Sequence, residues 1–140
     1  MRLYDWESRL AAYLARVARE GLAYGRHDCA LFAAGGEEAV TGHDPAAAWR
    51  GRYTTLAGGL RLIRKAGHAD HIAAARATHP RLPFGQALPG DWAVVPAGDG
   101  AQALGIVQGA LVYVLRDDPV RCGWLGLVPI ETATDLLAVR

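Results

Sequence analysis

Apolar and polar positions in the first half of the chain alternate with the period of amphipathic helices. After Asp5, a possible N-cap, apolar residues fall on one helical face as far as Val17, and Gly21 is the expected end of this helix. Similar patterns predict helices over about 28–40, closed by Gly42; over a brief stretch at 45–49; from about 55 to Gly67; and over about 70–78.

The pattern changes after Pro83 to short β-prone runs that are separated by Gly, Pro and Asp. These runs are 92–95, 104–107, 111–115 and 125–128. The stretch 98–100, Gly-Asp-Gly, predicts a loop or a hairpin tip between the first two runs. Helices followed by strands indicate an α+β domain with an antiparallel sheet, and the length of 140 residues fits a single domain over 1–140.

Composition narrows the function classes. Hydrophobic residues make up 51% of the chain and charged residues 21%, which is enough apolar side chain for a core. The 15 basic and 14 acidic residues nearly balance, so we expect no nucleic-acid partner. No run approaches the roughly 18 apolar residues of a membrane span, and the acidic N-terminal stretch is unlike a secretory signal. We therefore expect synthesis in the host cytoplasm and no membrane span.

The two cysteines, Cys29 and Cys122, are too few and too far apart for a disulfide scaffold or a zinc site, so we expect no metal and no cofactor. Cys29 follows the acidic cap Asp28 at the start of a predicted helix. Unpaired N–H groups and the helix dipole stabilise a thiolate there, which would lower the thiol pKa from about 8.5 into a reactive range. The alternative is a small buried core cysteine.

A resemblance to a known family adds to this. Gly25-x-x-Asp28-Cys29-x-x-Phe32 resembles the nucleophile motif of NlpC-type (papain-like) cell-wall peptidases. The segments 89–95 and 103–109 resemble two later strands of that family. The likeness implies a papain-like fold, with N-terminal helices packed on a C-terminal antiparallel sheet, and Cys29 at the nucleophile position.

A second likeness covers nearly the whole chain. Asp28 to Phe32, Thr41 to Pro45, Arg50 to Tyr53, Gly90-Asp91 and Leu104-Gly105 resemble a family of small phage and prophage proteins encoded among tail genes. This likeness implies a virion component at the distal tail, near the hub, that acts in genome delivery.

The chain departs from the peptidase pattern at Ala103, where the family histidine is expected. A thiol needs a basic partner to attack an amide and to protonate the leaving nitrogen. All five histidines precede the strands. Of these, His27 is the candidate for a substitute base, because it lies two residues before Cys29, whereas we expect His68, His71 and His79 to be solvated or interfacial.

Trp49 and Tyr53 flank Arg50-Gly51-Arg52. Aromatic residues and arginine are enriched at interface hot spots, so Trp49, Arg50, Arg52 and Tyr53 are a candidate partner-binding patch. The alternative, held equally, is that they brace the turn between two helices.

Two functions remain open. We predict a structural or assembly component of a phage-type tail tip, which uses an inactive NlpC-like fold to bind other tail proteins of the hub and distal tail. The alternative is an active cysteine peptidase or amidase that cleaves peptidoglycan peptides of the cell wall during genome delivery. The residue at position 103 favours the first.

Overall fold

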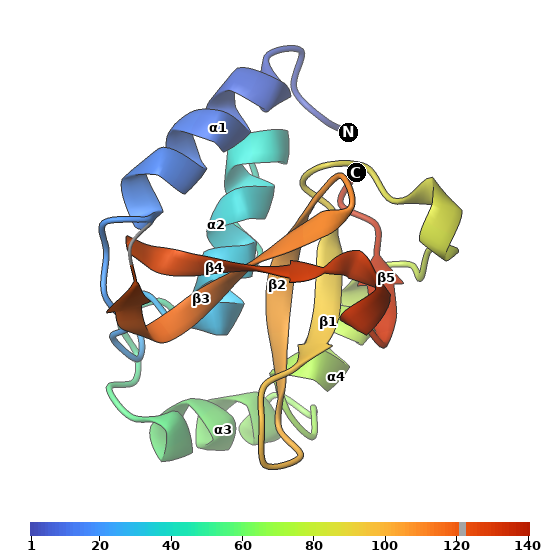
Figure 1. The fold of residues 1–140 in the computed structure, drawn as a ribbon. Coiled ribbons are helices and arrows are strands. Elements are labelled where there is room, and N and C mark those ends of the chain that lie inside the picture. The colour runs from blue at the N-terminus through green and yellow to red at the C-terminus, as the bar shows by residue number, and fades with distance from the viewer. Residues whose placement is uncertain (121–122) are drawn as a thin grey trace.

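A computed structural model describes the backbone of residues 1–120 and 123–140, and the side chains of 1–117 and 123–140. Within these ranges, four helices precede five strands; one short 3-10 turn lies between the last helix and the first strand, and another lies between the last two strands (Figure 1). The helices are α1 (Trp6–Val17), α2 (Cys29–Thr41), α3 (Leu56–Lys65) and α4 (His71–Thr78). The strands are β1 (Trp92–Pro96), β2 (Gln102–Gln108), β3 (Leu111–Val120), β4 (Gly123–Pro129) and β5 (Asp135–Leu137), and the 3-10 turns are η1 (Phe84–Gln86) and η2 (Ile130–Thr132).

The strands form one antiparallel sheet in the order β4-β3-β2-β1-β5. β1 lies between β2 and β5, and its Trp92 pairs with Ile106 on one side and with Leu137 on the other. Residues 98–100 form the tip of the β1–β2 hairpin, which extends toward α3 (Figure 1). The predicted α+β class and antiparallel sheet are therefore confirmed.

The main core lies between the sheet and the pair α1 and α2. Phe32 of α2 and Ile106 of β2 are fully buried within it. The Trp92 indole of β1 donates a hydrogen bond to the Ala33 carbonyl of α2 at 3.0 Å, which ties the helix to the central strand. This packing holds the first turn of α2, and Cys29 with it, against the sheet. A smaller cluster, which includes Val95, Val107 and Leu136, covers the other face.

Asp91, directly before β1, is a buried carboxylate that joins distant parts of the chain. Its oxygens accept hydrogen bonds from the Arg2 guanidinium (2.9 Å) and from the backbone N–H groups of Leu88 (2.8 Å) and Val139 (2.9 Å). Arg140 makes a further ion pair with it. The Gly-Asp pair that resembles a peptidase motif thus has a structural role here, since it fixes both chain ends beside β1.

Helix boundaries follow the capping residues. The side chains of Asp28, Thr55 and Asp70 each accept a hydrogen bond from a backbone N–H in the first turn of α2, α3 and α4. Gly42 closes α2 in the left-handed conformation, as predicted. These local signals are sufficient to predict where the helices begin, because each cap satisfies backbone groups within its own helix.

Two expectations about the elements are wrong, and one strand was not predicted. The segment 45–49 forms turns instead of a helix, although Asp44 caps it by accepting from the Ala46 N–H. The first helix ends at Val17 instead of near Gly21. The three-residue strand β5 was not expected, because its pairing with β1 depends on tertiary placement and not on local pattern.

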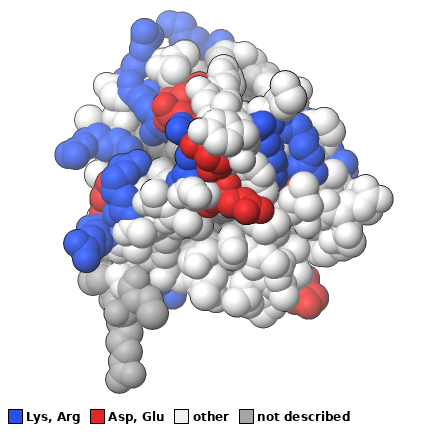
Figure 2. Space-filling view, turned by 90° about the horizontal axis from the view of Figure 1, so that it is seen from above, with Lys and Arg blue, Asp and Glu red and all other residues white. Residues whose placement is uncertain are grey.

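Basic and acidic side chains intersperse on the face around the two chain ends, with broad uncharged areas between them (Figure 2). On the same part of the molecule, the Arg2 guanidinium stacks on Trp6 at 4.4 Å from the ring centroid. None of the helices in the described ranges has both the length and the apolar composition needed to cross a membrane.

Candidate functional site

Cys29 is the first residue of α2, and a network around Asp28 fixes its position. The Asp28 carboxylate accepts hydrogen bonds from the N–H groups of Leu31 (3.0 Å) and Gly25 (3.2 Å). The Tyr53 hydroxyl donates to the same carboxylate at 2.5 Å. The helix start and the preceding turn are therefore held together from three sides, and the thiol is placed on the wall of a cleft.

Gly25 lets the segment 49–53 pack directly on this turn. Its φ of +83° favours glycine, and a Cβ there would lie 1.8 Å from the Tyr53 carbonyl oxygen. The Gly51 N–H also donates to the Gly25 carbonyl at 2.9 Å. A side chain at position 25 would push this segment away from the turn before α2.

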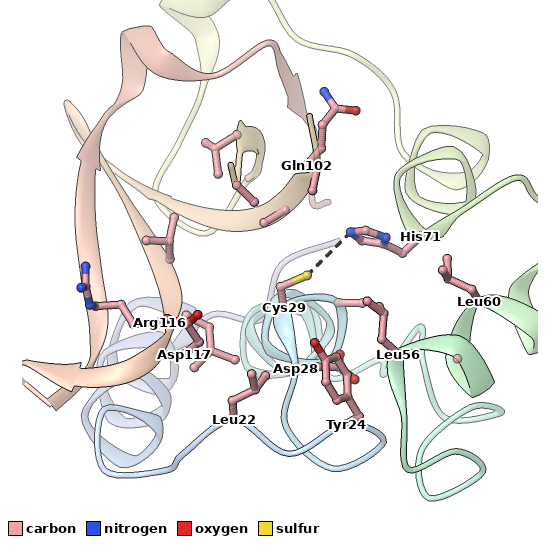
Figure 3. Close-up of a pocket in the computed structure, with 18 of the residues that line it drawn as sticks. Leu22, Tyr24, Asp28, Cys29, Leu56, Leu60, His71, Gln102, Arg116 and Asp117 are labelled. Atoms are coloured by element: carbon pink, nitrogen blue, oxygen red, sulfur yellow. Dashed lines mark hydrogen bonds between the residues drawn. The ribbon is translucent and has the colours of Figure 1, made fainter. Parts of the chain in front are cut away.

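His71 meets the thiol. It is the first residue of α4, and its Nε2 lies 3.6 Å from the Cys29 Sγ (Figure 3). Asp70 caps α4 by accepting a hydrogen bond from the Ala73 N–H at 2.8 Å, which fixes the turn that carries the imidazole. Two helix starts, 42 residues apart in sequence, thus face each other across the cleft.

Burial dominates the electrostatics of the pair. It raises the pKa of the Cys29 thiol to about 11, with a further rise from the Asp28 carboxylate, against backbone N–H groups at Leu104, Ala30 and Cys29 that favour the thiolate. Burial also lowers the pKa of His71, against opposing effects of Asp70 and of a hydrogen bond to the Gln102 backbone. At pH 7 the site therefore holds a neutral thiol beside a neutral imidazole.

The expected lowering of the Cys29 pKa by the helix N-terminus is thus wrong. The helix start does supply N–H groups to the sulfur, but the surrounding apolar side chains remove more hydration from a thiolate than these groups replace.

The thiol cleft, as we name the cavity lined by Cys29 and His71, has a volume of about 470 Å³. Its walls are largely apolar, with contributions from α3 (Leu56 and Leu60), from β1 (Val95) and from β4 (Val128). Polar groups enter from β3 and from the turn before α2 (Figure 3). The arrangement suits a substrate that brings an uncharged group to the sulfur.

Ala103 lies in β2 on the wall of the same cleft, where it presents a methyl group. The neighbouring Gln102 side chain points away from the thiol (Figure 3) and donates to the Thr134 hydroxyl at 3.3 Å. The structure therefore brings Ala103 and Cys29 to one site, but the imidazole comes from α4 and not from the strand.

His27, the candidate substitute base, lies in a different cavity, together with Arg16 and Glu20. Its ring packs edge-on against Phe32, and only 7% of the residue is exposed. Its Nε2 has no hydrogen-bond partner among the described residues. The turn that carries His27 directs its side chain into the core, so proximity in sequence to Cys29 does not bring the ring to the thiol cleft.

The expectation that His71 and His79 are solvated or interfacial is also wrong, because both side chains contact residues of α2. His79 is buried; its Nε2 lies 2.5 Å from a Glu37 carboxylate oxygen, and its ring lies 4.1 Å from that of Trp92. His68 is half-buried. The short, alanine-rich α4 lies against α3 and β2, and the histidines at its two ends contact side chains of α2.

The residues of the patch predicted at 49–53 mainly form contacts within the molecule. Arg50 pairs with Asp44 at 2.6 Å, and Tyr53 holds the Asp28 carboxylate. Trp49 is half-buried, and Arg52 is exposed. These contacts favour the alternative prediction, in which the segment braces the turn before α2.

Among the side chains that the structure describes, those of 1–117 and 123–140, no group of three or more His, Cys, Asp or Glu could hold a metal ion. Cys122 lies outside the described residues.

Comparison with known proteins gives one match. A family model described as a domain of unknown function (DUF6950) matches residues 1–139. The chain belongs to this family. The Cys29–His71 pair therefore lies within the DUF6950 domain, as does the whole sheet. No curated protein and no solved structure matches the chain.

Proposed function

We propose that this DUF6950 protein is a cysteine-dependent amidase in which Cys29 is the nucleophile and His71 is the general base. The observation that carries the proposal is the 3.6 Å contact between Sγ and Nε2 on the wall of an open cleft. The requirement for a basic partner, which Ala103 leaves unmet on β2, is then met from α4.

The reaction follows from the two groups. As Sγ attacks the carbonyl carbon of an amide, the thiol proton passes to His71 Nε2. The imidazolium then gives this proton to the leaving nitrogen, so the C–N bond breaks and an acyl thioester remains on Cys29. Water, deprotonated by His71, attacks the thioester, and the proton returns to the sulfur. The balance is amide plus water to acid plus amine.

The neutral pair favours proton transfer during attack over a preformed thiolate, since burial disfavours both ions. Backbone N–H groups at the start of α2 hydrogen-bond the Cys29 sulfur, so they stabilise the negative charge that develops there as the thiol proton leaves. The hydrogen bond from His71 to the Gln102 backbone orients the imidazole, a task that a third side chain performs in other cysteine enzymes.

The placement of the nucleophile at a helix start that packs on an antiparallel sheet supports the papain-like, NlpC-type identity that the sequence resemblance implies. Within this proposal, the substrates are peptide amides of the bacterial cell wall, and the reaction serves genome delivery.

A second candidate is a binding component of a phage-type tail tip, located in the virion tail, in which the same fold contacts hub and distal tail proteins without catalysis. The raised pKa of Cys29 favours this candidate, because the thiol is nearly unionised at pH 7. Detection of the protein in purified tail particles, together with an inactive purified protein, would support it.

The amidase is tested by incubating the purified protein with stem peptides prepared from peptidoglycan and detecting hydrolysed amides by mass spectrometry. We expect cleavage that is lost in Cys29→Ala and falls by at least about a hundredfold in His71→Ala. His27→Gln is the matched control and should retain activity. The rate should fall only below pH 6.5, because the pKa of His71 is lowered. Cleavage that persists in His71→Ala would exclude this base, and absence of cleavage would leave the binding candidate.

A further inference from the structure

A second cavity of about 470 Å³ adjoins the thiol cleft, and the two cavities share His71 with Ala30, Tyr53, Gly59 and Ile63. We name it the amine chamber. His71 lines both cavities, whereas Cys29 lines only the thiol cleft. The chamber is lined by α2, α3, α4, the 43–53 segment and the strands β1 and β2, and its apolar wall includes Leu31, Ala46, Trp49, Leu62, Ala74 and Trp92.

The chemistry of acyl transfer assigns the two cavities different halves of a substrate. The acyl carbon bonds to Sγ, so the acyl half remains in the thiol cleft. The leaving nitrogen receives its proton from His71, so the other half departs on the imidazole side. We infer that the amine chamber binds the leaving half of the substrate and selects an amine that carries an uncharged, apolar side group. The assignment of a leaving half rests on the proposed amidase activity.

The buried charges of the chamber support an uncharged side group. Glu37 and His79 are the ionisable residues on its wall with less than a tenth of their surface exposed, and they bind each other at 2.5 Å. No described buried charge on the wall is therefore left to pair with a charged side group. Desolvation of a charged group there would be uncompensated, whereas an aliphatic or aromatic group would replace water on Trp49, Leu62 and Ala74.

The tryptophans provide a direct readout of binding that needs no catalysis. Trp49 and Trp92 line the chamber, whereas Trp6 and Trp124 do not. The full chain carrying Cys29→Ala is labelled with 5-fluorotryptophan and titrated with L-phenylalaninamide; glycinamide, which has the same amine and amide without the side group, is the control. We expect the ¹⁹F signals of Trp49 and Trp92 to shift with phenylalaninamide alone, while those of Trp6 and Trp124 stay in place.

Kinetics test the leaving-group assignment. With one fixed acyl group, we expect kcat/KM for the phenylalaninamide substrate to exceed that for the glycinamide substrate by at least about tenfold. Ala74→Leu, which narrows the chamber, should remove this preference, and Ala77→Leu, on the exposed side of the same helix, should keep it. Thermal unfolding shows whether Ala74→Leu is folded; if it is not, the tryptophan titration of the chain with its native chamber decides.

The outcomes separate this inference from the proposed function. Shifts of Trp49 and Trp92 without any amide cleavage would retain the ligand class and reject the amidase. Cleavage without a side-group preference and without tryptophan shifts would retain the amidase and overturn the chamber assignment. Equal shifts with both amines, or larger shifts with argininamide than with phenylalaninamide, would also overturn it.

Discussion

At the scale of single residues, Cys29 and His71 form a pair whose two members both remain uncharged. An ion pair would be expected to react quickly with any small electrophile, whereas a neutral pair becomes reactive only when a carbonyl is placed beside it. This property limits side reactions of the thiol. Burial of the pair also shifts the pKa of Cys29 upward, the direction opposite to that expected from its position at a helix start.

The raised pKa of Cys29 predicts slow alkylation. At pH 7 a thiol with a pKa of about 11 is ionised in roughly one molecule in ten thousand, against about 3% for an ordinary cysteine. In a Cys122→Ser background, we expect the iodoacetamide rate, followed by mass spectrometry, to rise about tenfold per pH unit from 7 to 10. A rate that levels off near pH 8.5 would show that burial does not control the thiol.

The position of Ala103 predicts that an imidazole on β2 can replace the one that α4 supplies. Because Ala103 and Cys29 line the same cleft, an imidazole at position 103 could reach the sulfur from β2. We expect Ala103→His to restore part of the amide cleavage lost in His71→Ala, measured as kcat/KM. Val95→His, on the strand that pairs with Ala103, is the control for a general effect of an added imidazole. If kcat/KM of the double variant does not exceed that of His71→Ala alone, a side chain at position 103 does not reach the sulfur.

Sequence reasoning located the proposed nucleophile, Cys29, but not its proposed base, His71. Asp28-Cys29 at a predicted helix start is a local signal, and the structure confirms the helix. His71 also follows a cap, Asp70, so the sequence placed it correctly on α4. That α4 directs this residue at α2 depends on the packing of helices that are far apart in sequence, which no local pattern reports.

At the scale of elements, α4 has the task of holding an imidazole at its first residue. It has only eight residues, so its stability depends on its cap and on packing of Ile72 and Ala75 against the core. The helix presents His71 to the thiol and His79 to Glu37 from its two ends. Substitutions that shift the start of α4 should therefore change the position of His71, even where they replace no residue that contacts the sulfur.

Asp70→Ala tests this dependence. Loss of the cap should lower the free energy of unfolding by about 1 kcal/mol, measured by urea denaturation. Activity should fall further than stability explains, because the first turn of α4 carries His71. Asp70→Ser, which can still cap, should restore both. Activity unchanged in a destabilised Asp70→Ala protein would show that the helix start is held by its packing alone.

At the scale of the whole molecule, the helices supply the Cys29–His71 pair, whereas the sheet supplies backbone groups and a cleft wall. The sheet interacts with the site through Leu104 and Gln102 of β2. β2 is in turn held by β1, which Asp91 joins to both ends of the chain. The alignment of the cleft therefore depends on contacts remote from it.

Asp91→Ala should be strongly destabilising. It leaves the largely buried Arg2 guanidinium and the Leu88 and Val139 N–H groups without this acceptor, at a cost on the order of 3 kcal/mol in unfolding free energy. Arg140→Ala should cost less than about 1 kcal/mol, because that side chain is 43% exposed. Chemical denaturation of both variants checks the order, and equal effects would contradict this account of Asp91.

Because the environment of Cys29 differs between the folded and the unfolded chain, the alkylation of this thiol reports how often the protein unfolds. In an unfolded chain the thiol regains an ordinary acidity, so a brief exposure to an alkylating reagent at neutral pH marks the molecules that have opened and spares the rest. The labelled fraction over time then reports how often the domain opens inside a mixture, such as a cell extract, where spectroscopic signals of one protein are hidden. Used with Cys122→Ser, this single thiol would measure the persistence of the fold under the conditions in which the protein works.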